Sequence, residues 1–228
     1  MAQTWHDLLF AHWPLDPEQL RPLVPPALPL DRFDGAAWVG VVPFSMSGVR
    51  PRAMPALPWI SAFPELNVRT YVTLEDKPGV YFFSLDAANR LAVATARRLF
   101  LLPYFHARMS ARLAGDSVRY ASDRIHQGAP AASLRMAYRP TGPAQNPRPG
   151  SLEQFLTERY CLYTTDARGR PFRCNIQHPP WPLQPAEAQI EQNTMAAASK
   201  IALPDRPPLL HFARRQDMVA WLLEPAGR

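Results

Sequence analysis

Four side chains that could do chemistry alternate along residues 65–71, which read Glu-Leu-Asn-Val-Arg-Thr-Tyr. The stretch is apolar and β-branched and predicts a strand, so Glu65, Asn67, Arg69 and Tyr71 are expected on one face. Arg69 could bind a carboxylate or phosphate with its planar fork, and Glu65 could act as a general acid or base. The same pair could instead be a structural ion pair. Whether this face lines an enclosed cavity decides between the two interpretations.

The elements that must position this stripe are mostly strands. Alternating or β-rich segments predict strands at 4–13, 38–44, 65–73, 80–85, 104–113, 117–122, 188–194 and within 209–223. Helices are expected after Asp16, over residues 87–100 and from Ser151, where Ser151 and Gln154 match a capping box. The proline-rich segment 48–64 is expected to be a long ordered loop that covers part of a cavity. The pattern predicts one α+β, mainly antiparallel domain over residues 1–228.

Composition and charge distribution narrow the classes of partner. Apolar residues make up 47% of the 228 residues, which is typical of a globular chain. The net charge is +6, but only two basic residues are lysines and the arginines are scattered, so no nucleic acid is expected as a partner. No run of about 18 apolar residues predicts a membrane span, and residues 1–10 do not resemble a secretion signal. A cytoplasmic protein without a membrane partner is expected.

The two cysteines flank a predicted hairpin turn at residues 166–169. With a four-residue loop, Cys161 would lie opposite Cys174, so a disulfide is conceivable. In a reducing cytoplasm two partly buried thiols are favoured instead. The six histidines show no spacing typical of a metal site, and no glycine-rich phosphate loop occurs, so neither a metal nor a cofactor is expected.

Several segments together resemble the bacterial YqjF-like proteins, a domain of unknown function. They are residues 5–17, 20–25, 63–72, 79–86 and 178–183. That family is similar in turn to the acetoacetate-decarboxylase-like superfamily. The resemblance implies a cone-shaped, largely antiparallel β-barrel with a few short helices, enclosing a small-molecule pocket and commonly assembled as a homo-oligomer.

Decarboxylases of that superfamily use a lysine that forms a Schiff base with a keto acid. In the matching segment Arg97 corresponds to the family arginine and Pro103 to the proline, while Tyr104 and Phe105 occupy the two lysine positions. A phenol or phenyl group cannot form an imine, so the resemblance implies a pocket without Schiff-base chemistry. Glu65 falls where those decarboxylases place a pocket glutamate.

The expectation is therefore a pocket that binds, and as an enzyme would transform, a small anionic organic molecule such as a carboxylate. The candidate catalytic residues are Glu65, Arg69 and Tyr104, and the candidate ligand-binding residues are Asn67, Tyr71, Arg97, His106, His178 and Trp181. Each has a structural alternative, which is core packing for the aromatic residues, a solvated helix position for the arginine and a strand-positioning turn for residues 178–181. A non-catalytic binding protein, or a structural protein that keeps only the fold, remains the alternative function.

Overall fold

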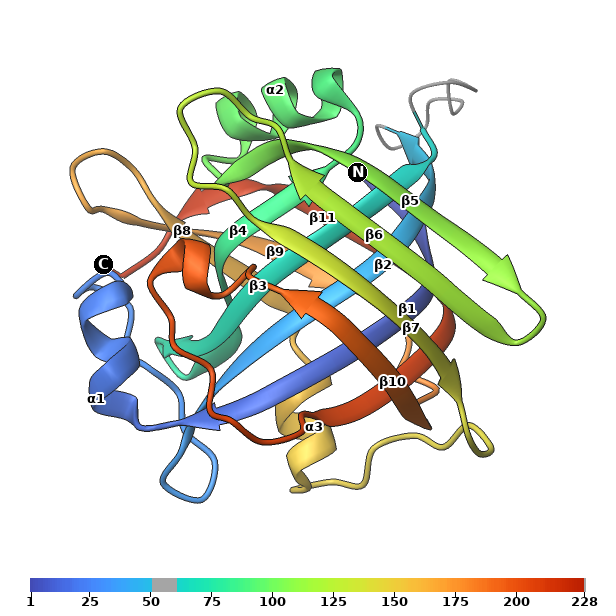
Figure 1. The fold of residues 1–228 in the computed structure, drawn as a ribbon. Coiled ribbons are helices and arrows are strands. Elements are labelled where there is room, and N and C mark those ends of the chain that lie inside the picture. Colours follow the sequence, from blue (N-terminus) through green and yellow to red (C-terminus); the bar gives the residue numbers. More distant parts are fainter. Residues whose placement is uncertain (51–60, 228) are drawn as a thin grey trace.

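The computed structural model describes residues 1–50 and 61–227 and is dominated by strands (Figure 1). The strands are β1 (Ala2–Leu15), β2 (Ala37–Arg50), β3 (Phe63–Leu74), β4 (Lys77–Ala87), β5 (Tyr104–Ala114), β6 (Ser117–Arg124), β7 (Ser133–Pro140), β8 (Cys161–Thr165), β9 (Pro171–Gln177), β10 (Gln184–Asn193) and β11 (Leu209–Pro225). The α-helices are α1 (Pro17–Leu20), α2 (Arg90–Leu99) and α3 (Leu152–Thr157), and short 3-10 helices span Arg21–Leu23 and Ala197–Ser199. The predicted α+β, mainly antiparallel class is confirmed.

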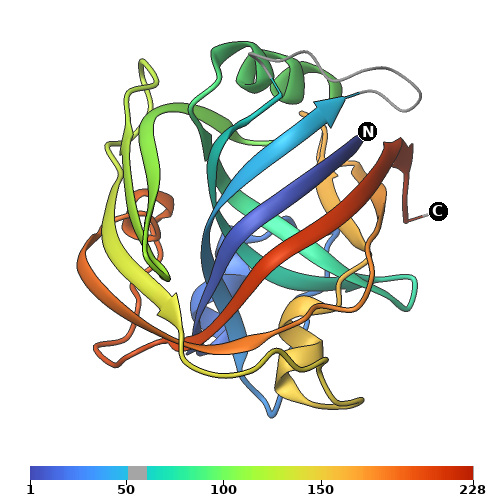
Figure 2. The same cartoon turned by 90° about the vertical axis from the view of Figure 1, so that its right-hand side faces the viewer.

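Strand pairing closes two rings of strands that have five strands in common. The fold is therefore two joined rings rather than one simple barrel. The shared strands are β11, β1, β2, β3 and β4. Strands β8 and β9 complete the small ring, and strands β5, β6, β7 and β10 complete the large ring. The two halves lie on opposite sides of the shared strands in Figure 2. The sheet can branch in this way because β4 pairs with β5 along one part and with β8 along another. In the same way, β11 pairs with β10 along one part and with β9 along another.

Strand β3 lies in the shared wall, and both of its faces are buried. Leu66 and Val68 pack into a core with Tyr120 of β6 and Met136 of β7, inside the large ring. On the other face, Tyr71 packs against strands of the small ring. The alternation predicted for residues 65–71 is therefore confirmed, and the polar face points into the small ring rather than to solvent.

One helix closes each end of the small ring, with α2 at one end of the molecule and α3 at the other (Figures 1 and 2). Val93 is the buried residue of α2 and packs with Phe63 and Ala87. Leu156 of α3 is fully buried beside Tyr71. Asn89 caps α2 by accepting from two backbone N–H groups, and Ser151 accepts from the Gln154 N–H as the capping box predicts. The helices thus bracket the polar face of β3.

Three sequence predictions need correction. Residues 48–50 continue β2 and Pro64 lies within β3, while residues 51–60 of the predicted loop lie outside the described residues. The strand β7 was not predicted, although Leu134, Met136 and Tyr138 alternate along it and are all buried. The helix expected over 87–100 begins only at Arg90, because Ala87 completes β4.

The hairpin that carries the cysteines has a longer loop than expected. Thr165 pairs with Pro171, so the register moves by one residue and Cys161 lies opposite Asn175. The Asp166 carboxylate accepts from the Arg168 and Arg170 N–H groups, which holds a five-residue loop. Both cysteines are buried free thiols.

Two further findings bear on partners and metals. Within residues 1–50 and 61–227, no helix is long and apolar enough to cross a membrane. Over the same residues, no group of three or more histidine, cysteine, aspartate or glutamate side chains is arranged to hold a metal ion.

Candidate functional site

The polar face of β3 forms a buried column inside the small ring, which we call the interior column and define as Glu65, Asn67, Arg69 and Tyr71. The exposed fractions of Glu65, Asn67 and Tyr71 are 4%, 5% and 0%, and Arg69 is partly buried. Alternation places the four side chains on one side of the strand. The structure thus brings together the four residues that the sequence pattern singled out.

At the α2 end of the column, Glu65 forms a hydrogen bond with Tyr104, the first residue of β5. The Tyr104 hydroxyl donates to Glu65 Oε2 at 2.8 Å. Burial raises the pKa of Glu65 to about 8, against the lowering effect of the Tyr104 hydrogen bond, and the nearby Asp86 carboxylate raises it further. Glu65 is therefore mostly protonated at neutral pH. Because Oε2 accepts from Tyr104, the carboxyl proton is left to Oε1.

Arg69 lies at the middle of the column without a carboxylate beside it. Its Nη2 donates to the Leu156 carbonyl at 3.1 Å, and its guanidinium lies 5.3 Å from the centroid of the Phe10 ring. In the described part of the chain no carboxylate oxygen comes within 4.0 Å of its nitrogens. Arg69 Nε and Asn67 Oδ1 are buried and meet no hydrogen-bond partner among the described residues. The column therefore carries an uncompensated positive charge.

At the α3 end, Tyr71 connects the column to the helix. Its hydroxyl donates to the Leu156 carbonyl at 2.8 Å and lies 2.6 Å from His12 Nε2. Since the tyrosine proton goes to the carbonyl, the imidazole donates from Nε2. Burial, then Arg69, holds the pKa of His12 well below its usual range, so this ring is neutral. A side chain at Gly40 would meet His12 at 2.9 Å, which explains the glycine opposite it.

His12 was not among the predicted site residues, and neither was a buried ion pair in the large ring. Arg124 donates to both carboxylate oxygens of Asp86, at 2.9 and 2.6 Å, and the side chains are 2% and 0% exposed. Asp86 is the one charged residue in the apolar run of β4 after Lys77, which is the signal that could have found it. The Arg124 guanidinium also lies 4.1 Å from the centroid of the Phe105 ring.

Arg97 and His106, both predicted to bind a ligand, lie outside the ring at the α2 end. Arg97 Nη1 donates to the Tyr104 carbonyl at 2.6 Å, so it contacts the backbone of the residue whose hydroxyl reaches Glu65. Both side chains line an open cavity of about 580 Å³ beside α2. A second cavity near Arg97 measures about 350 Å³. The structure therefore separates these two residues from the interior column.

The predicted residues His178 and Trp181 lie side by side, with 5.2 Å between ring centroids, but only Trp181 packs toward the interior column. Trp181 is 2% exposed and packs edge-on against Phe10 with 4.8 Å between centroids, so one ring separates it from Arg69. His178 stacks on Tyr160 with 4.6 Å between centroids and donates from Nδ1 to the Pro179 carbonyl at 2.8 Å. Trp181 borders the interior column, whereas His178 belongs to the turn that leads to it.

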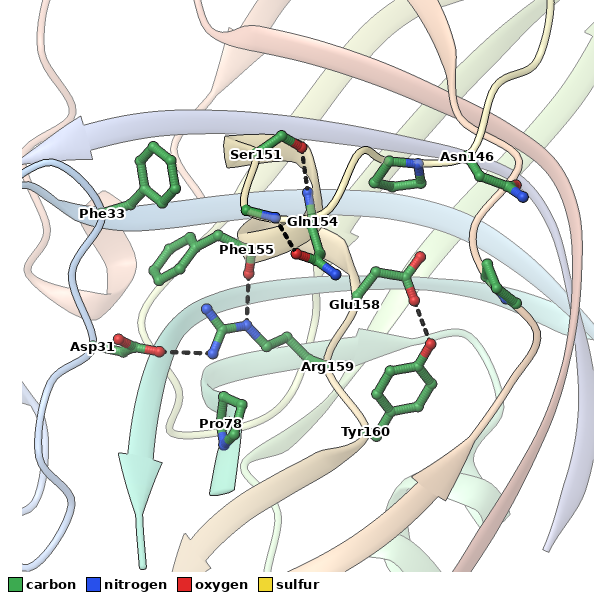
Figure 3. A pocket seen from close by; sticks show the side chains of 13 residues that line it. Asp31, Phe33, Pro78, Asn146, Ser151, Gln154, Phe155, Glu158, Arg159 and Tyr160 are labelled. Atoms are coloured by element: carbon green, nitrogen blue, oxygen red, sulfur yellow. Dashed lines mark hydrogen bonds and ion pairs between the residues drawn. The ribbon is translucent and has the colours of Figure 1, made fainter. Parts of the chain in front are cut away.

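Figure 3 shows a further cavity of about 680 Å³, at the α3 end. Arg159 spans its wall, donating to Asp31 Oδ2 at 2.7 Å and to the Phe155 carbonyl at 2.6 Å. The hydroxyl of Tyr160 donates to the carboxylate of Glu158. The charged groups of this cavity are thus already bonded to one another. No residue of the interior column lines any of these three cavities.

Comparison with known proteins places the chain in a family. Residues 2–217 match the model of the DUF2071 family, described as an uncharacterized conserved protein. This chain belongs to the DUF2071 family. A curated relative, the uncharacterized protein YqjF of Bacillus subtilis (strain 168), is 49% identical over 223 residues, which cover 98% of this chain and 91% of YqjF. The YqjF-like resemblance predicted from the five sequence segments is confirmed.

Solved structures show that this DUF2071 chain has the acetoacetate-decarboxylase-like fold. An acetoacetate decarboxylase superposes with a TM-score of 0.67 at 14% identity, covering 99% of this chain and 89% of its own. The enduracididine biosynthesis enzyme MppR with HEPES buffer bound also gives 0.67, at 10% identity over 98% and 86% of the two chains. The decarboxylase of Legionella pneumophila subsp. pneumophila str. Philadelphia 1 gives 0.64 at 12% identity, over 100% and 88%. At these identities the likeness extends to the fold alone.

Proposed function

We propose that this protein binds a small organic anion with one negative charge, such as a carboxylate, against the interior column, in a state in which the side chains packed there make room for it, because none of the three cavities described above reaches the column. The observation that carries the proposal is Arg69, a partly buried guanidinium with no carboxylate within 4.0 Å among the described residues. A buried cation without an opposite charge is costly, and a bound anion would offset that cost. Asn67 Oδ1 also meets no described hydrogen-bond partner, but it is an acceptor and would pair with a donor group of the ligand rather than with its carboxylate.

The charge balance of the column supports a singly charged ligand. At neutral pH burial keeps Glu65 mostly protonated and His12 neutral, because it raises the pKa of the first and lowers that of the second. Tyr71 and Tyr104 stay protonated because burial raises the pKa of each phenol. Arg69 then supplies the charge of the column, and a monoanion would neutralise it without leaving an excess.

A catalytic role adds one step to this binding function. Glu65 is mostly protonated at neutral pH, so it could give its proton to a basic atom of a bound ligand and be left as a carboxylate that accepts from Tyr104. Arg69 would hold the anionic group of the ligand in place during that transfer. The observation that favours this candidate is the pKa of about 8, which lies close to a general acid's working range. A protein that uses the fold only as a scaffold remains the alternative.

The proposed chemistry does not run through an imine. Tyr104 stands against Glu65 and offers a phenol rather than an amine. Lys77 begins β4 opposite Leu74, far along β3 from Glu65, and its amine donates to Asn175. Lys200 follows the Ala197–Ser199 turn. Borohydride trapping with acetoacetate or pyruvate should give no covalent adduct by mass spectrometry, and an adduct on either lysine would contradict this part of the proposal.

The test of binding compares matched arginine variants. A thermal-shift screen of small carboxylates would select a probe, and calorimetry would then measure its Kd for the native protein, Arg69→Met and Arg119→Met. We expect about a tenfold or larger loss of affinity in Arg69→Met, because a charge-assisted hydrogen bond is worth about 1.5–3 kcal/mol. Arg119 is exposed on β6, so its variant should bind normally. Equal affinity in all three proteins would contradict binding at Arg69, and the absence of saturable binding by any carboxylate would leave the fold-only alternative.

The expectation of a homo-oligomer stays a prediction. Light scattering after size exclusion would measure the mass in solution, and a single species near the 25.7 kDa of one chain would contradict it.

A further inference from the structure

A groove outside the small ring concentrates positive charge without any carboxylate in its lining. It lies between α2 and the segment after β6 and has a volume of about 580 Å³. Its polar residues are Arg90, Arg97, Arg98, His106, His126 and Gln127. We call it the basic groove. Its remaining lining residues are apolar, namely Val93, Ala94 and Ile125.

The three arginines of the basic groove are not neutralised by the protein around them. No carboxylate oxygen of residues 1–50 or 61–227 lies within 4.0 Å of their nitrogens. Arg97 is held in place by its hydrogen bond to the Tyr104 carbonyl, and Arg90 Nε lies 3.4 Å from His106 Nδ1. Cations placed side by side repel one another, and this repulsion would be relieved by a bound anion.

His126 adds a directed donor rather than compensating charge, whereas the His106 ring is engaged by Arg90 Nε and by the Ala88 carbonyl. His126 Nδ1 accepts the backbone N–H of His106 at 3.1 Å, so its neutral ring carries the proton on Nε2. Burial, then Arg90 and His126, lowers the pKa of His106, while a hydrogen bond to the Ala88 carbonyl raises it. The buried Asp86 nearby is occupied by two hydrogen bonds from Arg124. It therefore cannot serve the groove.

We propose that the basic groove is a binding site for the phosphate group of a soluble organic phosphate monoester. A phosphate monoester carries close to two negative charges and three equivalent acceptor oxygens at neutral pH, which matches several guanidinium groups better than a carboxylate does. The groove is larger than a phosphate ion and has an apolar wall, so the organic part of the ligand packs against Val93, Ala94 and Ile125. This site is distinct from the interior column and does not depend on it.

Phenyl phosphate and benzoate are suitable probes, because they share the ring and differ in the acid group. Calorimetry at low salt would compare the native protein, the double variant Arg90→Gln/Arg98→Gln and the control Arg112→Gln/Arg119→Gln. The control removes two exposed arginines from the far end of the β5–β6 hairpin and changes the net charge equally. We expect saturable binding of phenyl phosphate that weakens about tenfold or more in the groove variant and less than about twofold in the control.

Further measurements separate binding in the basic groove from binding at the interior column or at a membrane surface. Arg69→Met should bind phenyl phosphate as the native protein does, and benzoate should bind the groove at least about tenfold more weakly than phenyl phosphate. A proton NMR titration should show the His106 pKa rising when phenyl phosphate is present. Equal losses in both double variants, no saturable binding, or binding only to vesicles of phosphatidylcholine with phosphatidic acid would each overturn the proposal.

Discussion

At the α3 end of the small ring, Arg159 meets a carboxylate at 2.7 Å and a carbonyl at 2.6 Å, whereas at the α2 end three arginines face a groove with no carboxylate in its lining. Both ends are closed by a short helix and both border a cavity of several hundred Å³. The first arrangement uses arginine to hold the chain together, and the second leaves arginine available to solvent and solutes. The number of charges at a cavity is thus a poorer guide to binding than whether the protein already neutralises them.

A large effect is expected on the stability of the α3 end. Arg159→Met should lower the free energy of unfolding by about 3 kcal/mol, because it breaks a buried ion pair and leaves Asp31 unmatched. Urea unfolding measures this loss. Arg32→Met, an exposed neighbour of Asp31, is the control and should change stability by less than about 0.5 kcal/mol. Equal stability of Arg159→Met and Arg32→Met would show that the ion pair of Arg159 does not stabilise the α3 end, and the contrast with the α2 end would be lost.

The pH dependence of stability tests the protonation of Glu65. Unfolded Glu65 loses its proton near pH 4.5 and folded Glu65 near pH 8, so the folded state holds an extra proton between these values. The free energy of unfolding should therefore fall as pH rises across this window, by a total on the order of 5 kcal/mol, and level off above it.

The matched variant for this pH effect is Glu65→Gln, which is neutral at every pH. The free energy of unfolding of Glu65→Gln should not show this fall between pH 4.5 and 8. Above pH 8 it should exceed that of the native protein. If the free energy of unfolding had the same pH dependence in both proteins, Glu65 would be ionised throughout. It could then not act as the proposed general acid.

A smaller effect is expected from Tyr71→Phe, which removes the hydroxyl between His12 and the Leu156 carbonyl. We expect a loss of about 1–3 kcal/mol, because both buried groups lose a hydrogen-bond partner. Thermal unfolding would measure it. Tyr81→Phe is the control, because Tyr81 is only partly buried on the same sheet and keeps its edge-on ring contact with Phe83 when the hydroxyl is removed. The control should cost less than Tyr71→Phe.

The smallest expected effect is on the stability of the α2 end. The double variant Arg90→Gln/Arg98→Gln should unfold within about 0.5 kcal/mol of the native protein, because both side chains are exposed and have no carboxylate partner among the described residues. Urea unfolding in the same buffer as for Arg159→Met would make the contrast direct. A loss as large as that of Arg159→Met would mean that these arginines are structural.

The strand pattern around Glu65 could be predicted because period-two alternation is local. The side-chain directions of Glu65 and Arg69 follow from it, and so does the burial of Leu66. The contacts that give the site its chemistry could not be predicted in this way. Tyr104 reaches Glu65 from 39 residues away, and Leu156 reaches Tyr71 from 85 residues away. Such pairs depend on which strands close the ring.

Other features were missed for local reasons. The alternation of Leu134, Met136 and Tyr138 is the local signal that could have found β7. At Asp166 an Asx turn added one residue to a loop and moved the cysteine register. The matched motif predicts Arg97 in the pocket, whereas its side chain lies outside the ring, between α2 and β5, and donates to the Tyr104 carbonyl. A motif fixes the position of a residue along the chain, whereas the direction of a long side chain depends on the packing around the helix.

The shared position of β3 has a consequence for how this chain can vary. In most strands an inserted residue moves an apolar face toward water, but here both faces enter a core. One residue added near Leu66 would turn leucine and valine into the small ring and drive a glutamate and an arginine into the apolar packing of the large ring. A single inserted residue would therefore disrupt the packing of both cores. Relatives of this protein should therefore differ in β3 by substitution and keep its length.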